Sequence, residues 1–298
     1  MKYIFIINGR NDRRGIIDSD LSRQLQGKDI EYSMYHTVGV GDGIRYVRIY
    51  CDLHQDEEVC FVACGGSGTL NETMSGLVGF RRKSLAFLAY GATNDFAKYY
   101  PDHDFTSLQK ILDGQTVKVD VIKANNSYAI NVINIGFDSH VAASGNHYIE
   151  IGMSGEKAYR KSLMDSILFK RRNGIQVIAD GERLNRRSML QCTLGNARYC
   201  GGQFLCCPRA VVDDGLMEVC LIKTCSLLAF FRIMLAYGKG RHLDDRFCRK
   251  RIVYRRSIHV QLRSKNLITI CLDGEMMADI DFDITILPKE ISFVLPRI

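Results

Sequence analysis

The hydrophobic pattern of the first 112 residues alternates between short apolar runs and segments with helical spacing. Runs typical of strands occupy Lys2–Ile7, Glu31–Thr37, Val59–Cys64 and Leu85–Ala89. Apolar residues three and four positions apart predict helices at Ser19–Leu25, Gly43–Leu53, Leu70–Val78 and Phe105–Leu112. Strands that alternate with helices form βαβ units, so this part of the chain predicts a parallel sheet.

Strand patterns dominate after Gln115. They occupy Thr116–Ile122, Tyr128–Ile135, Ile175–Ala179, Met189–Leu194, Met217–Ile222, Ser257–Leu262, Leu267–Leu272 and Asp281–Leu287. Helical spacing returns only at Glu156–Arg171 and Leu227–Tyr237, and Asp-Gly pairs at Asp180 and Asp273 predict hairpin turns. We therefore predict an α/β protein. A Rossmann-like domain with a parallel sheet spans residues 1–120, with the tail at about 288–298 as a candidate addition. A mainly antiparallel β-sandwich domain follows at 121–287.

Composition and charge narrow the class of partner. The chain has 298 residues, is 46% hydrophobic and 24% charged, as globular proteins are, and carries a formal net charge of +7. Basic residues cluster at Arg10/Arg13/Arg14, Arg81/Arg82/Lys83, Lys170/Arg171/Arg172 and Arg246/Arg249/Lys250/Arg251. Each cluster is either a solvated surface or an attraction for an anion, and charge alone admits nucleic acid and acidic lipid. Because no nucleic-acid-binding motif occurs, we expect an anionic membrane and no nucleic acid.

The cysteines and the apolar segments indicate in which compartment the protein is expected and how it could contact a membrane. Eleven cysteines lack paired-ligand spacing, and Met1–Ile7, with one lysine and a short apolar run, is expected to be a strand and not a signal peptide. We therefore expect free thiols in a reducing cytoplasm. The longest apolar helix, Leu227–Tyr237, contains Arg232 and is far shorter than the roughly 20 residues that span a bilayer. Any membrane contact is therefore expected to be peripheral.

A glycine-rich turn follows the third predicted strand. The sequence Gly-Gly-Ser-Gly-Thr starts at Gly65 and leads directly into a predicted helix. Glycines let the backbone approach a ligand, and the first N–H groups of a helix attract anions, so a phosphate is the natural guest. Neither a Walker loop nor the Rossmann glycine spacing is present. A tight turn without any ligand remains the alternative.

Five further segments match motifs of one known family and follow one another in the same order along the sequence. They are Tyr90–Phe96 (Tyr-Gly-Ala-Thr-Asn-Asp-Phe), Asn131–Asp138, Asn196–Gly202, Val212–Val219 and Leu272–Glu275 (Leu-Asp-Gly-Glu). Together with the glycine turn, they resemble the diacylglycerol kinase catalytic family, which includes bacterial lipid kinases and the sphingosine and ceramide kinases. The resemblance covers nearly the whole chain. It departs from the family pattern at Ser67, where the family has aspartate, at Ala92-Thr93, where threonine usually comes first, and at Asn8-Gly9, which stands for Asn-Pro.

The resemblance implies a set of site residues. Glu275 is the expected catalytic base, with Asp273 beside it. Nucleotide binding is expected at Asn8, Gly65, Gly66, Ser67, Gly68, Thr69, Glu72, Thr93, Asn94 and Asp95. Metal binding is expected at Asp120 and at a structural magnesium site formed by Val211, Asp214 and Leu216, since hard oxygen ligands suit that ion.

The resemblance also implies a function. It predicts an ATP-dependent kinase that uses Mg²⁺ to transfer the γ-phosphoryl group to the hydroxyl of a lipid such as diacylglycerol, as in phospholipid biosynthesis. The first domain would bind nucleotide and the second the lipid, at the inner face of the membrane, and a homodimer is expected. Two alternatives remain open. One is a catalytically impaired relative that binds nucleotide or lipid, because Ser67 lacks the charge of aspartate. The other is an enzyme similar to NAD kinases.

Overall fold

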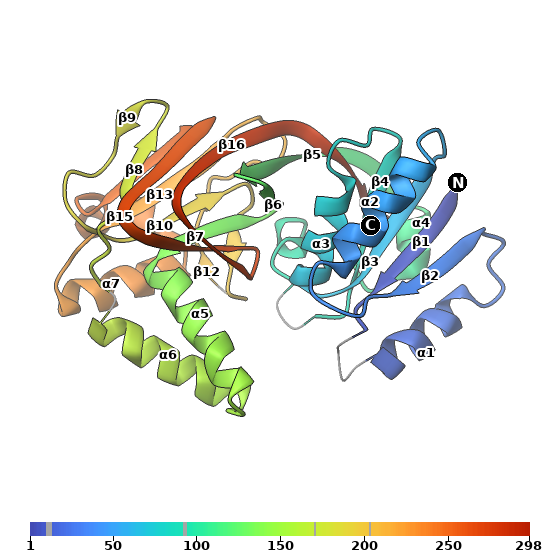
Figure 1. Ribbon diagram of the computed structural model, residues 1–298, viewed down its shortest axis with the longest axis horizontal. Helices are drawn as coiled ribbons and strands as arrows, with labels where there is room; N and C mark the ends of the chain where they lie inside the picture. Colours follow the sequence, from blue (N-terminus) through green and yellow to red (C-terminus); the bar gives the residue numbers. More distant parts are fainter. Residues whose placement is uncertain (10–13, 92–93, 170, 203) are drawn as a thin grey trace. The chain divides into compact units, whose positions relative to one another are not determined.

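The computed structural model describes residues 1–9, 14–91, 94–169, 171–202 and 204–298 (Figure 1). The chain divides into two compact units. Unit 1 comprises Met1–Val121 and Leu287–Ile298, and unit 2 comprises Ile122–Ile286. Two strands, β5 (Gln115–Ala124) and β16 (Glu275–Leu295), have residues in both units, so the tail returns to unit 1 through β16.

Unit 1 is built on a parallel sheet. Its strands are β1 (Lys2–Ile7), β2 (Tyr32–His36), β3 (Val59–Gly65) and β4 (Lys83–Ala89), in the order β4-β3-β1-β2, with the end of β16 beside β4. Every residue of β3 is buried, as expected for a strand covered on both faces. The continuous apolar runs in the sequence have this origin.

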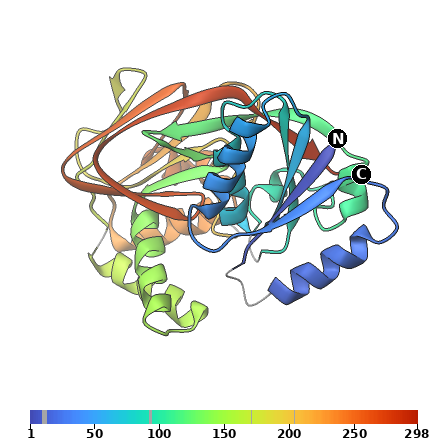
Figure 2. The same cartoon turned by 45° about the vertical axis from the view of Figure 1, so that its right-hand side comes forward.

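Helices cover both faces of this sheet. They are α1 (Arg14–Leu25), α2 (Asp42–Leu53), α3 (Ser67–Leu77) and α4 (Leu108–Leu112), with a 3₁₀ turn at Ala97–Tyr99. The apolar side chains of α1 and α4 share a buried cluster with Phe5, Ile7 and Val62. Figure 2 shows α2 on the other side of the sheet from α1. A Cβ atom on Gly76 would lie 2.7 Å from Val47 Cβ, so α2 and α3 pack closely because this position is glycine.

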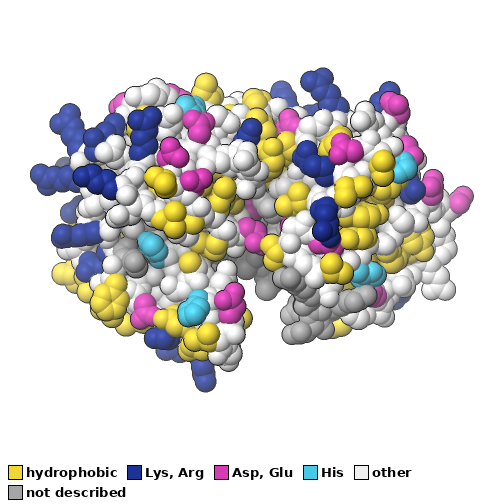
Figure 3. Space-filling model, in the orientation of Figure 1, with side chains coloured by type: hydrophobic (Ala, Val, Ile, Leu, Met, Phe, Trp, Pro, Cys, Tyr) yellow, Lys and Arg dark blue, Asp and Glu magenta, His cyan; other side chains and the backbone are white. Residues whose placement is uncertain are grey.

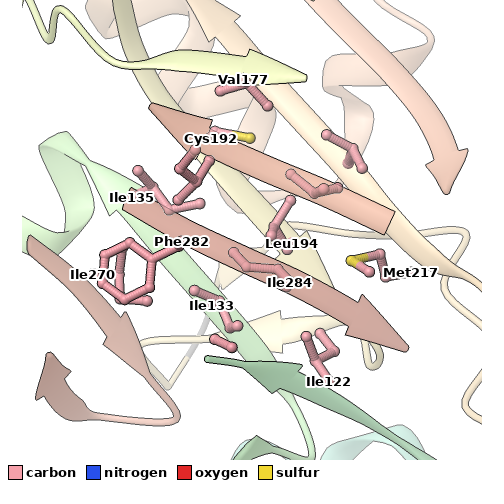
Figure 4. Packing of buried hydrophobic residues seen from close by; sticks show 14 of the residues in the cluster. Ile122, Ile133, Ile135, Val177, Cys192, Leu194, Met217, Ile270, Phe282 and Ile284 are labelled. Carbon is pink, nitrogen blue, oxygen red and sulfur yellow. The ribbon is translucent and has the colours of Figure 1, made fainter. Parts of the chain in front are cut away.

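Unit 2 is antiparallel and β-rich. Its main sheet has the order β14-β13-β10-β7-β15-β16. The strands are β6 (Ser127–Ala129), β7 (Val132–Gly136), β8 (Gln176–Ala179), β9 (Glu182–Arg183), β10 (Met189–Gly195), β11 (Tyr199–Cys200), β12 (Phe204–Leu205), β13 (Met217–Lys223), β14 (Ile252–Ser257) and β15 (His259–Leu272). One face packs a core that includes Ile133, Leu194, Ile270 and Phe282, which Figure 4 shows within one cluster of side chains.

Three helices cover another part of unit 2. They are α5 (Phe137–Glu150), α6 (Gly155–Phe169) and α7 (Leu227–Gly238), followed by a 3₁₀ turn at Arg241–Leu243 and by α8 (Arg246–Arg249). Phe137, Ile167 and Phe230, one from each long helix, lie in one buried cluster. The rings of Phe137 and Phe230 are 5.1 Å apart. Among the described helices, none combines the length and the apolar character needed to cross a bilayer.

The predicted fold class, a parallel α/β part followed by an antiparallel β-rich part, is confirmed. Both predicted Asp-Gly hairpin turns are present, with positive φ at Asp180 and Asp273. Helix α5 was not predicted, because it buries only Phe137 and Ser139 and has little apolar periodicity. The two strands predicted within His259–Leu272 form one strand whose pairing with β16 is irregular between Arg263 and Ile268.

Candidate functional site

The glycine turn lies at the carboxyl edge of the unit 1 sheet. Strand β3 ends at Gly65, and α3 begins two residues later. The carbonyl of Gly65 accepts hydrogen bonds from the N–H groups of Tyr90 and Gly91, both at 2.9 Å. The turns after β3 and β4 are therefore held together by backbone bonds. In parallel sheets this edge is where ligands bind.

Two of the glycines are required by packing. A Cβ atom on Gly91 would lie 2.4 Å from Gly66 Cα, and one on Gly65 would lie 2.3 Å from Thr69 Oγ1. Neither position can hold a side chain without moving its neighbour. Gly66 itself has more room, because an added Cβ would be 3.4 Å from Gly91 Cα. The close approach of the two turns therefore explains Gly91, and the Thr69 side chain explains Gly65, but neither explains Gly66.

The start of α3 is open to an anion. Gly66 occupies the N-cap position, and no described side chain caps the helix. Its first N–H groups therefore have no intrahelical partner and carry the positive end of the helix dipole. Ser67 and Gly68 are partly exposed, while Thr69 is buried. This arrangement fits the phosphate group of a nucleotide.

Asn94 adds a buried acceptor beside the same turns. It has a left-handed backbone with φ of 42°, and its Nδ2 donates to the Gly91 carbonyl at 2.8 Å. Its Oδ1 is buried and has no hydrogen-bond partner among the described residues. Such an atom is costly to leave unpaired, so a donor from a bound ligand would satisfy it. Thr93, also expected to bind nucleotide, lies outside the described residues.

The other residues expected at the nucleotide have protein partners. Asp95 is buried, and its Oδ1 lies 3.0 Å from Lys98 Nζ. Glu72 accepts hydrogen bonds from the N–H groups of Gly41 (2.8 Å) and Gly43 (3.0 Å), so its carboxylate holds the start of α2. Asn8 directly follows β1, which places it at the same sheet edge as the glycine turn.

Asp120 supports an unusual backbone in unit 1. Its side chain is fully buried on β5, and its Oδ1 accepts a hydrogen bond of 2.6 Å from the N–H of Lys289. Lys289 has a φ of 53°, a conformation that costs energy for a residue with a side chain. The Asp120 carboxylate therefore stabilises a bend in β16.

The carboxylates expected at the reacting group lie on the β15–β16 hairpin of unit 2. Asp273 occupies the turn and is 8% exposed. Its carboxylate accepts hydrogen bonds from three consecutive N–H groups, those of Ile130 (2.7 Å), Asn131 (3.2 Å) and Val132 (2.8 Å). Glu275 begins β16 opposite Leu272 and is exposed. Asp273 thus fixes the hairpin, and Glu275 presents a carboxylate to solvent.

The expected structural magnesium site already contains a protein cation. Asp214 Oδ1 accepts a hydrogen bond from the Leu216 N–H at 3.0 Å, and Asp214 Oδ2 forms an ion pair with Arg256. Val211 is 36% exposed. Among the described residues, no group of three or more His, Cys, Asp or Glu side chains is arranged to hold a metal ion. The charge of Asp214 is therefore paired by a guanidinium, and magnesium binding at Val211, Asp214 and Leu216 stays a prediction.

A partly buried polar group in unit 2 contains Asp138, which ends the motif Asn131–Asp138 but received no expected role from the sequence. Burial raises the pKa of Asp138 to about 7, and Gln191 Nε2 donates to its Oδ2 at 2.8 Å. Thr193, two residues further along β10, bonds to Asn134 Oδ1 at 3.1 Å and to the Tyr237 hydroxyl at 2.9 Å. The available signal was Gln191 and Thr193, two polar residues within the otherwise apolar run of β10.

Comparison with known proteins identifies both parts of the chain. A diacylglycerol kinase catalytic domain matches residues 2–124, and a YegS C-terminal NAD kinase beta sandwich-like domain matches residues 131–295. The chain is 25% identical over 305 residues to a protein named diacylglycerol kinase from Bacillus subtilis (strain 168), covering 100% of this chain and 97% of that protein. It is 28% identical over 275 residues to "Probable lipid kinase YegS-like" from Shewanella frigidimarina (strain NCIMB 400), covering 88% and 85% of the two chains.

A solved structure has the same fold. It is a Bacillus anthracis str. Sterne protein, provisionally named a diacylglycerol kinase, with a TM-score of 0.76 at 19% identity. The likeness covers 99% of this chain and 97% of that chain. The order of the two matched domains agrees with the order of the motifs along the sequence. The chain therefore belongs to the diacylglycerol kinase family, with the catalytic domain followed by a YegS-type C-terminal domain.

Proposed function

We propose that this protein is an ATP-dependent lipid kinase that phosphorylates the hydroxyl of a membrane lipid such as diacylglycerol. Membership of the family makes it a kinase. Nucleotide binding is supported by the start of α3, where Gly66 is the N-cap residue and no described side chain caps the helix. Phosphoryl transfer depends mainly on positioning and charge stabilisation, and a helix N-terminus supplies both to a phosphate.

The residues divide the work as follows. The N–H groups at the start of α3 hold phosphate oxygens, and Asn94 Oδ1 accepts a donor from the nucleotide. Glu275 takes the proton of the acceptor hydroxyl, a role open to an exposed carboxylate. Asp273 is a positioning residue, because its three bonds to the backbone fix the hairpin that carries Glu275. When bound with ATP, Mg²⁺ would offset the negative charge of the phosphates.

A transfer assay with three acceptors tests the proposal. Purified protein, ATP and Mg²⁺ are incubated with diacylglycerol, sphingosine or NAD, and the phosphorylated product is identified by mass spectrometry. We expect a phosphorylated lipid and no NADP. The matched variant Glu275→Gln keeps the size of the side chain but removes its basicity, so we expect at least a hundredfold lower turnover with ATP affinity unchanged. NADP as the main product, or near-normal turnover of this variant, contradicts the proposal.

Ser67 supports a second candidate, a relative that binds nucleotide or lipid without transferring phosphate. Serine stands at the first position of α3, where a carboxylate would face the phosphates. A neutral hydroxyl gives a metal ion an oxygen ligand but no charge. ATP binding by calorimetry without product from any lipid acceptor would favour this candidate over the kinase.

The acceptor's location defines where the enzyme acts. A lipid hydroxyl lies at the membrane surface, so the protein must reach that surface to phosphorylate it. We place the protein at the cytoplasmic face, where ATP and acidic lipids are both present. Sedimentation with anionic and neutral vesicles checks this expectation.

A further inference from the structure

Helix α7 has an apolar surface on both of its sides. It buries Ala229, Phe230, Ile233 and Tyr237 in unit 2. On its opposite side Leu228 is 86% exposed, Phe231 50% and Leu235 72%. A surface helix of a globular protein normally presents polar residues there, so this exposed stripe requires an explanation.

The end of α6 extends the same apolar surface. Leu168 and Phe169 are 61% and 76% exposed. They line an open pocket of about 720 Å³ together with Arg171, Arg172, Thr224, Cys225, Ser226 and Leu227. The pocket therefore joins the last turn of α6 to the first turn of α7. We call Leu168, Phe169, Leu227, Leu228, Phe231 and Leu235 the apolar face.

Positive charge surrounds the apolar face. Residues 223–251 contain eight Lys and Arg against two Asp, a net charge of +6 within a chain of +7. Arg232 of α7 and Arg251 both lie over the Phe247 ring, at 4.5 and 3.8 Å from its centroid, so the ring holds Arg251 beside the helix. Arg171 and Arg172 line the pocket itself. At the lower left of Figure 3, over the ends of α6 and α7, hydrophobic and basic side chains lie next to one another.

The basic cluster Arg81/Arg82/Lys83 of unit 1 lacks this combination, while Arg10 and Arg13 lie outside the described residues. Lys83 is 4% exposed, and its Nζ bonds to the carbonyls of His54 (2.6 Å) and Glu57, so it cannot contact a partner. Its neighbours Arg81 and Arg82 are exposed. They provide a natural comparison, since they are an exposed arginine pair on unit 1.

We propose that the apolar face and its arginines dock unit 2 on a bilayer that contains acidic phospholipids. Helix α7 has 12 residues and lies in the plane of the interface, with Leu228, Phe231 and Leu235 among the acyl chains. The arginines contact lipid phosphates at the headgroup level. A protein partner would need only the apolar stripe, whereas acidic lipid explains both the stripe and the charge. The proposal rests on the proposed function, since a lipid kinase must reach its acceptor.

The apolar part is tested by vesicle sedimentation. Wild type, Leu228→Gln/Leu235→Gln and the control Leu267→Gln/Ile280→Gln are mixed with vesicles of 30% phosphatidylserine in phosphatidylcholine. Leu267 and Ile280 are 66% and 64% exposed on the β15–β16 hairpin. We expect the α7 variant to bind at least tenfold more weakly and the control within twofold of wild type, with unchanged unfolding temperatures. Equal binding by all three proteins would overturn the proposal.

The charged part is tested with matched arginine pairs. Arg171→Gln/Arg172→Gln should lose at least threefold in affinity for the acidic vesicles, and Arg81→Gln/Arg82→Gln should lose less. Binding should fall as salt rises, and vesicles of phosphatidylcholine alone should bind the wild type more weakly. An equal loss in the two pairs, or equal binding to neutral vesicles, would contradict the assignment.

Two further readouts distinguish membrane docking from dimerisation and from a direct effect on catalysis. Light scattering measures the mass of each protein. If the wild type is a dimer, and the α7 variant is a monomer that still binds vesicles, then the apolar face is a contact between two copies of the chain. That result would overturn the proposal. Turnover of a dispersed short-chain diacylglycerol should be the same in wild type and the α7 variant, while turnover on vesicles falls. If wild type binds vesicles through this face but phosphorylates no lipid, docking stands and the kinase proposal fails.

Discussion

Gly66 is the residue where packing and ligand binding can be separated. A side chain at Gly65 would meet the Thr69 side chain, and one at Gly91 would meet the backbone of Gly66, so a substitution at either position would disturb the turn before it affected a ligand. Gly66 has φ of −105° and room for a Cβ. A change at Gly66 can therefore test the phosphate site without unfolding it.

The expected result is a contrast between two substitutions. Gly66→Asp puts a negative charge at the start of α3, so ATP affinity should fall by at least about tenfold. Gly66→Ala adds only a methyl group and should stay within about threefold of wild type. Isothermal calorimetry gives both affinities, and circular dichroism checks the fold. Equal affinity in all three proteins would mean that the loop is only a turn.

A substitution at Ser67 tests whether a negative charge at this position affects the magnesium requirement of the site. A carboxylate beside the phosphates would add charge to the surroundings of a magnesium ion. We expect Ser67→Asp to lower the Mg²⁺ concentration for half-maximal lipid phosphorylation by about threefold or more. Ser67→Asn has a similar size without the charge and is the control. Identical magnesium curves for the three active proteins would show that residue 67 does not act on the ion.

At the scale of elements, the two Asp-Gly hairpins have similar turns but different environments. The Asp273 carboxylate is buried and holds three N–H groups of residues 130–132. Asp180, between β8 and β9, is exposed, and its Oδ1 accepts from Ile258 and His259 at 3.2 and 3.1 Å. Loss of a buried charged acceptor costs more than loss of one that water can replace.

We therefore expect unequal effects on stability. Asp273→Asn should lower the free energy of unfolding by about 2–4 kcal/mol, because an amide presents one acceptor and one donor to three donors. Asp180→Asn should cost less than about 1 kcal/mol. Urea unfolding followed by circular dichroism measures both. A smaller loss for Asp273 than for Asp180 would contradict the structural role of the Asp273 carboxylate.

The hydrophobic pattern predicts strands well where both faces of the strand are buried. The apolar runs at β1 and β3 gave the parallel sheet, because both faces of these strands are covered. Helix α5 escaped the pattern, since it packs through few apolar residues beside α6. Helix α1 begins at Arg14 rather than at the predicted Ser19.

The candidate site was predictable in part, because motifs give residues but not their partners. The glycine turn lies at the sheet edge, as the strand–turn–helix order predicts. The sequence could not reveal that Glu72 holds α2, that Asp120 holds Lys289 or that Arg256 pairs with Asp214. These contacts join residues 31 to 169 positions apart, and only the folded backbone brings them together.

At the scale of the whole molecule, two titratable groups of unit 2, the buried His242 and the partly buried Asp138, set limits on the pH of maximum stability. Burial lowers the pKa of His242 from 6.5 to about 4, so stability is lost as pH falls below about 6.5. Burial raises the pKa of Asp138 from 3.8 to about 7. Between pH 3.8 and about 7, Asp138 binds more protons in the folded state than in the unfolded state. The folded state therefore loses stability as the pH rises from about 4 to 7.

Asp138→Asn should remove the second of these limits. The amide keeps an oxygen for the Gln191 Nε2 bond but carries no charge at any pH. The shift of the Asp138 pKa corresponds to roughly 4 kcal/mol as an upper bound, so the variant should be at least about 1 kcal/mol more stable than wild type at pH 8. At pH 4.5 the two proteins should unfold within about 1 kcal/mol of each other, because Asp138 is then protonated in the folded wild type. Urea unfolding at both pH values measures the difference. A stability gap that is the same at pH 4.5 and pH 8 would mean that the Asp138 carboxyl does not titrate between them in the folded protein.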